Sequence, residues 1–80
     1  MLTKDESELR SLVIQKLTDR TLPAEDPERT WAGPGAGHPC ALCGATITRE
    51  ETEYELQFGE DALRFHRPCQ EIWNRERRGR

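Results

Sequence analysis

Three cysteines and one histidine occur in two pairs, and their spacing limits what a chain of 80 residues can fold into. Cys40 and Cys43 are separated by two residues, and so are His66 and Cys69. A two-residue gap lets one turn of the backbone present both side chains of a pair to the same point. Three thiolates and one imidazole complete a tetrahedral shell, which is the coordination of structural Zn²⁺. The sequence therefore predicts one structural zinc ion per chain, bound by Cys40, Cys43, His66 and Cys69.

The composition explains why such a chain needs a metal. Only 34% of the residues are apolar and another 34% are charged, and a core of this size supplies about 3–5 kcal/mol of stability. No stretch approaches the roughly 20 apolar residues of a membrane span, so we expect no membrane partner. The first residues are acidic where a secretory signal is basic and then apolar, and three cysteines cannot all pair within one chain. We therefore expect a reducing, cytoplasmic setting in which the cysteines are not disulfide-bonded.

Residues 1–22 read as an amphipathic helix, formed from about Lys4 to Asp19. Thr3 and Glu6 have the spacing of a capping box, which marks a helix N-terminus. The apolar side chains then recur at helical spacing, on one face, at Leu9, Leu12, Val13 and Leu17. One such helix cannot bury its apolar face alone, so it must dock on the rest of the chain or on another copy.

Residues 23–39 read as a linker, because four prolines and three glycines in this stretch disfavour a helix or a central strand. Trp31 interrupts the linker. We expect it to hold the loop over the core, since large aromatic side chains bury the most area per residue. The alternative is that Trp31 is exposed and contacts a binding partner.

Residues 40–80 carry the signals of a β-hairpin. Residues 53–58 alternate, with Tyr54, Leu56 and Phe58 on one face. A turn at residues 59–61 leads into a second strand that ends at His66. The acidic residues of this region are expected to form a solvated face; they are Glu50, Glu51, Glu53 and Glu55.

A C-terminal helix is expected after the hairpin. Pro68 suits the first turn of a helix, residues 70–78 are good helix formers, and Gly79 ends them. Trp73 lies one helical turn after Cys69, where packing on the hairpin is the expected role and a binding hot spot is the alternative. The predicted fold class is α+β: a small zinc-stabilised domain with N-terminal helix, linker, zinc knuckle, β-hairpin and C-terminal helix.

The order CxxC, hairpin, then HxxC opening a helix resembles a treble-clef zinc finger. The 22-residue gap from 44 to 65 is similar to that of the first finger of a LIM domain, and the likeness covers residues 40 to 78. The resemblance implies that Cys40 and Cys43 form a zinc knuckle, that His66 ligates from the second strand and Cys69 from the first helical turn. It also implies a positive φ at Gly44, which lets backbone N–H groups point at the Cys40 sulfur. The finger of poly(ADP-ribose) polymerases, which binds broken DNA, has the same ligand order with a longer gap.

The sequence also offers three alternative roles for these residues. His38 could replace His66 as fourth ligand, but this would break the HxxC pair and put three ligands on one short loop. A redox CxxC would need a thioredoxin-like βαβ setting, which the pattern lacks. The PCxxC at residues 39–43 matches half of a nucleotide deaminase motif, but the HxE that would move the proton is absent. Since four protein ligands also close the shell, we expect no catalysis.

The charge pattern leaves two functions open. Net charge is −3, yet residues 64–80 hold six arginines and two acids. The leading expectation is a protein-interaction or adaptor module, because an acidic chain lacks the basic stripe of a dedicated nucleic-acid binder. The alternative is a nucleic-acid-binding zinc finger, related to transcription, and pairing with acids would weigh against it. It would use Arg64, Arg67, Arg75, Arg77, Arg78 and Arg80.

Overall fold

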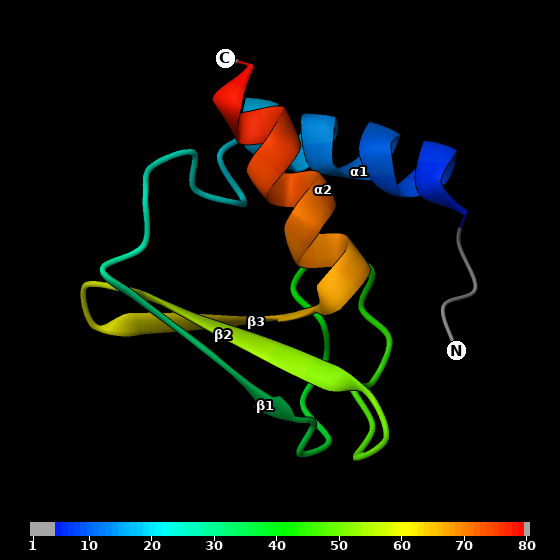
Figure 1. The fold of residues 1–80 in the computed structure, drawn as a ribbon. Helices are drawn as coiled ribbons and strands as arrows, with labels where there is room; N and C mark the ends of the chain where they lie inside the picture. Colours follow the sequence, from blue (N-terminus) through cyan, green and yellow to red (C-terminus); the bar gives the residue numbers. More distant parts are fainter. Residues whose placement is uncertain (1–4, 80) are drawn as a thin grey trace.

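A computed structural model describes residues 5–79 as two helices and one antiparallel sheet (Figure 1). The strand order is β1-β2-β3; α2 packs against β2 and β3, and α1 packs against α2. The α+β fold class predicted from the sequence is confirmed. In chain order the elements are α1 (Glu6–Thr18), β1 (Arg29–Pro34), β2 (Thr52–Phe58), β3 (Asp61–His66) and α2 (Arg67–Arg78).

Helix α1 begins at Glu6, two residues later than expected. Asp5 is its N-cap, because Asp5 Oδ1 accepts a hydrogen bond from the Glu8 N–H at 2.9 Å. The expected capping box included Thr3, which lies outside the described residues. The apolar face is as predicted: three of its residues are buried and Leu12 packs against them from the side. The buried three are Leu9, Val13 and Leu17.

The predicted hairpin is confirmed. Strands β2 and β3 pair with Leu56 opposite Leu63 and with Tyr54 opposite Phe65. Gly59 turns the chain at a φ of 62°, a conformation that glycine adopts without strain. Leu56 and Phe65 are fully buried beneath α2, so the alternation in the sequence does place this face toward the core.

The expectation that residues 23–39 are only a linker was incomplete, because residues 29–34 form strand β1. Strand β1 pairs antiparallel with β2, and Trp31 lies opposite Glu55. Proline is tolerated here because β1 is an edge strand, where one side of the backbone needs no ladder hydrogen bonds. Gly35 follows the strand, and its backbone passes so close to the Thr48 and Ile47 carbonyls that no larger residue would fit.

The expected role of Trp31 was wrong, and Trp73 holds the loop instead. Trp31 is 46% exposed, because it points to the sheet face opposite the core. Trp73 is completely buried, stacks on Phe65 with ring centroids 5.7 Å apart, and donates from Nε1 to the Pro23 carbonyl at 2.9 Å. Trp73 is therefore a core residue, as predicted, and its hydrogen bond also fixes the loop that follows α1.

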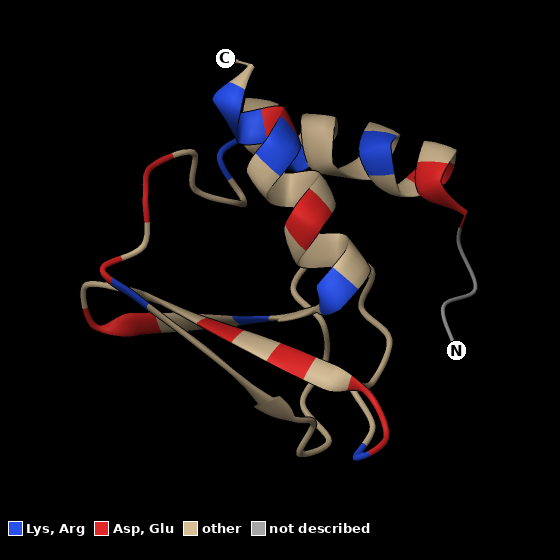
Figure 2. Cartoon of the chain, viewed as in Figure 1, with Lys and Arg blue, Asp and Glu red and all other residues tan. Residues whose placement is uncertain are grey.

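Charged residues are distributed differently on the sheet and on α2 (Figure 2). Acidic residues alternate with uncharged residues along β2, whereas α2 carries both signs along its length. None of the helices within residues 5–79 combines the length and the apolar character needed to cross a bilayer.

Candidate metal centre

A tight turn at residues 40–45 presents the first cysteine pair. The Gly44 N–H donates to the Cys40 carbonyl at 3.0 Å, and the Cys40 N–H donates to the Ala45 carbonyl at 2.9 Å. Gly44 has a φ of 80°, as the resemblance implied. The Ala41 N–H donates to the Arg64 carbonyl at 2.7 Å, which fixes the turn against β3. The first pair is thereby held beside the strand that carries the second.

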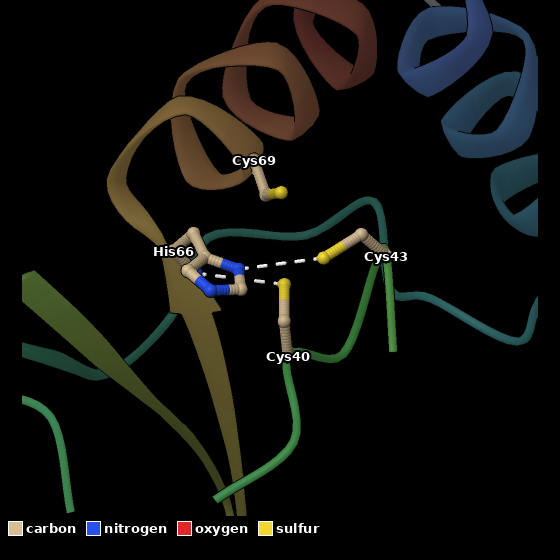
Figure 3. A group of neighbouring side chains, drawn as sticks. All are labelled: Cys40, Cys43, His66 and Cys69. Carbon is tan, nitrogen blue, oxygen red and sulfur yellow. Dashed lines mark hydrogen bonds between the residues drawn. The ribbon is translucent and has the colours of Figure 1, made fainter. Parts of the chain in front are cut away.

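The structure brings together all four residues predicted as ligands (Figure 3). Cys40 and Cys43 lie on the turn, His66 is the last residue of β3, and Cys69 lies in the first turn of α2. One ligand atom from each residue lies within 4.8 Å of every other. Cys43 Sγ is 3.4 Å from His66 Nδ1, and the His66 N–H points at Cys40 Sγ at 3.5 Å. These four residues could hold a metal ion.

The site is shielded as well as compact. Cys40, His66 and Cys69 are buried, and Cys43 is partly buried. A tetrahedral ion with bonds of about 2.0–2.3 Å separates its ligand atoms by roughly 3.5–3.8 Å. The 3.4 Å between Cys43 Sγ and His66 Nδ1 is close to that separation. The donor set therefore fits a small four-coordinate ion.

The thiols perturb one another's pKa in opposite directions. The Cys69 thiol and several backbone N–H groups donate toward the Cys40 sulfur, which lowers the pKa of Cys40 well below its ordinary value. The pKa of Cys69 is raised because it gives this hydrogen bond and is buried, and burial raises the pKa of Cys43. One thiolate is therefore favoured in the cluster and the others resist ionising beside it. A cation between the three sulfurs removes that conflict.

Glu51 orients the imidazole, a role that the sequence analysis missed. His66 Nε2 lies 3.2 Å from Glu51 Oε1 and 3.3 Å from the Thr46 carbonyl. Both partners accept, so Nε2 carries the proton and the Nδ1 lone pair faces the thiols. Glu51 Oε1 also accepts from the Thr48 N–H at 2.8 Å, and this hydrogen bond lowers the pKa of Glu51. A histidine that binds a metal through one ring nitrogen usually donates a hydrogen bond from the other. This rule was the signal in the sequence that could have pointed to an acceptor such as Glu51.

Replacing Glu51 with alanine should weaken metal binding. Loss of the carboxylate leaves the Thr46 carbonyl as the remaining acceptor for Nε2 and lowers the basicity of Nδ1. Changes of this kind typically reduce metal affinity about 10–100-fold. Competition with a chromophoric chelator, with Zn²⁺ as probe, would measure the change. The matched control is Glu50→Ala, since Glu50 is exposed. Equal affinities for Glu51→Ala and Glu50→Ala would contradict the role given to Glu51.

His38 does not join the cluster. Its Nδ1 lies 3.5 Å from Glu53 Oε1, and its side chain is 47% exposed. The loop that follows β1 places His38 beside Glu53 and not among the cysteines. The alternative in which His38 replaces His66 is not what the structure shows.

The C-terminal arginines face acids rather than forming one uncovered patch. Arg64 lies on β3 between Glu53 and Glu55, at 3.7 and 3.8 Å. The others that have partners are on α2: Arg67 with Glu71 at 3.4 Å, Arg75 with Glu6 at 3.2 Å, and Arg77 with Asp26 at 2.7 Å. Arg77 also lies over the Trp73 ring, 4.6 Å from its centroid. Arg78 is exposed, and Arg80 lies outside the described residues.

Comparisons with protein-family models, with curated proteins and with solved structures found no match to this chain.

Proposed function

We propose that this protein is a structural zinc module that acts by binding another protein, without catalysis. The observation that carries the proposal is the closed and largely buried set of donors at Cys40, Cys43, His66 and Cys69. Four protein ligands leave no coordination position for water or substrate, which is typical of structural zinc and unlike catalytic zinc. The metal then replaces the apolar core that the composition does not supply.

Zinc is favoured by the chemistry of the donors. Three sulfurs and one nitrogen suit a borderline-soft ion with tetrahedral preference, whereas Mg²⁺ and Ca²⁺ select oxygen ligands. The expected bonds are about 2.3 Å to sulfur and about 2.0–2.1 Å to nitrogen. The sequence of turn, hairpin and helix supports classification as a treble-clef finger like the first finger of a LIM domain. Three thiols kept reduced suit a cytoplasmic location.

Strand β1 offers the surface for a protein partner. Trp31 is exposed on the outer face of the sheet, where its cross-strand neighbour is Glu55. Tryptophan is among the residue types most enriched in binding hot spots, and Trp31 is the most exposed large apolar side chain of the described residues. We therefore assign the interaction surface to β1 and its outer face.

Nucleic acid is the weaker candidate. Four of the arginines that could contact phosphates lie against carboxylates, so binding would first require those ion pairs to be broken. The outer face of the sheet also carries Glu53 and Glu55, which would repel a phosphate backbone.

A photoreactive side chain placed at Thr30 would test this proposal. Thr30 is exposed on β1, and Glu60, in the exposed hairpin turn, is the control position. After irradiation in cell extract, adducts at position 30 should be digested by protease, resist nuclease and be absent from position 60. Nuclease-sensitive adducts, or sub-micromolar binding to a generic DNA duplex at physiological salt, would reject the protein-interaction function in favour of nucleic-acid binding.

A further inference from the structure

The outer edge of β1 carries backbone groups that no other described residue satisfies. The Gly35 N–H donates to the Glu51 carbonyl at 2.9 Å, which continues the register between β1 and β2. Hydrogen-bonding residues alternate along an antiparallel pair, so Trp31 and Gly33 direct their N–H and C=O groups at β2. Thr30 and Ala32 therefore direct theirs away from the sheet, and both residues are exposed. Such an edge is a template for another strand.

Strand β1 can pair with a copy of itself in one favoured register. Pro34 has no N–H and ends the strand, so pairing must centre nearer the other end. If Trp31 lies opposite Trp31 of a second copy, Thr30 and Ala32 of each chain exchange N–H and C=O bonds with Ala32 and Thr30 of the other. The two indoles then meet on the same outer face, where an aromatic cross-strand pair is favourable.

The charges of the outer face are complementary in this register. Arg29 of one copy lies opposite Gly33 of the other, and nothing stands within 4 Å of the position where a side chain on Gly33 would begin. Beyond Gly33 lies its cross-strand neighbour Glu53, whose Oε1 is buried and accepts no hydrogen bond from a described residue, although His38 Nδ1 lies 3.5 Å away. Within residues 5–79, no carboxylate lies within 4 Å of Arg29. An arginine that crosses the space above Gly33 would gain a carboxylate partner and would give Glu53 Oε1 the hydrogen-bond donor that His38 does not provide.

We propose that the protein forms a two-fold symmetric dimer through antiparallel pairing of β1 with β1 of a second copy, joining two three-stranded sheets into one. This inference rests on the proposed function, because it names the partner of the β1 surface. The self-complementary register and the match of Arg29 to Glu53 favour a second copy over an unrelated extended peptide. An isologous contact of this kind closes on itself and leaves no unpaired β1 edge.

Native mass spectrometry of the zinc-loaded protein tests the proposal, because it counts chains and metal ions together. The expected species has two chains and two zinc ions. Ala32→Pro removes an N–H that the single chain does not use, so it should give one chain with one zinc ion and raise the dimer dissociation constant at least about tenfold. Ala36→Pro is the matched control, since Ala36 lies in an exposed loop and its N–H has no backbone acceptor among the described residues.

A second variant covers the case in which Ala32→Pro fails to fold. Arg29→Glu keeps the backbone and places two carboxylates together, so it should also weaken the dimer by roughly tenfold or more. Arg78→Glu, a charge reversal at the far end of α2, should not. One chain with one zinc ion in the unmodified protein at every concentration, or a dimer unaffected by both β1 variants, would overturn the β1 pairing. A chain without bound zinc would instead count against the proposed function.

Discussion

Removing zinc with a chelator should unfold the domain, and Cys69→Ser should have the same effect. Cys69 lies where α2 meets the turn and the hairpin, so the ligands hold together three segments of the chain. Coordination of structural zinc contributes about 10–16 kcal/mol in finger peptides, whereas a core of this size contributes about 3–5 kcal/mol. The chemical-shift dispersion of the amides of residues 40–78 should collapse. Helix α1 should unfold as well because its packing partner is α2, so the helical circular dichroism of the whole chain should be lost.

Restoring the metal provides the control for this result. Added Zn²⁺ should return the native spectrum of the unmodified chain, and Mg²⁺ should not, because sulfur is a poor ligand for it. A spectrum that stays dispersed after the metal has been removed would show that the apolar core suffices, and the account of zinc as the main source of stability would be wrong.

Trp73→Ala should cost about 3–5 kcal/mol of unfolding free energy, the largest effect expected from a residue that binds no metal. The side chain is fully buried, stacks on Phe65 and meets Phe58 edge-on with centroids 6.1 Å apart. Truncation leaves a cavity, removes the cation–π contact with Arg77 and leaves the Pro23 carbonyl without its donor. Urea unfolding at saturating zinc would measure the change.

Trp31→Ala is the matched control for Trp73→Ala, because it removes the same side chain from an exposed site. At a protein concentration low enough to keep the chain monomeric, it should change the free energy of unfolding by about 0.5 kcal/mol or less. Equal costs for the two variants would mean that the buried cluster around Trp73 does not act as the core.

The parts of the fold that depend on local pattern could be predicted from the sequence. The metal cluster follows from two short gaps, and the hairpin follows from alternation at Tyr54, Leu56 and Phe58. Pro68 and Gly79 mark the ends of α2 well, since Pro68 is the second residue of the helix and Gly79 its C-cap. In each case the residues that carry the signal are the same residues that form the structure.

The missed features depend on contacts between distant segments. Strand β1 forms because β2 offers a partner, although its own prolines and glycines read as a linker. Which tryptophan is buried depends on which face of the sheet α2 covers, and nothing near Trp31 or Trp73 in the sequence decides that. Glu51 belongs to the metal site because its loop folds back on His66, 15 residues later. In the sequence it cannot be distinguished from the solvated Glu50 beside it.

The docking of α1 on α2 joins one end of the described chain to the other. Ion pairs connect Glu6 with Arg75 at 3.2 Å and Arg10 with Glu76 at 3.0 Å, and among the described elements α1 packs against α2 alone. During synthesis, α1 is therefore made first, and the helix that it packs against, residues 67–78, is made last. The same is true of the metal shell, which lacks two ligands until His66 and Cys69 are made. This order of assembly makes folding an all-or-none event over nearly the whole described chain, and incomplete chains remain exposed to proteases.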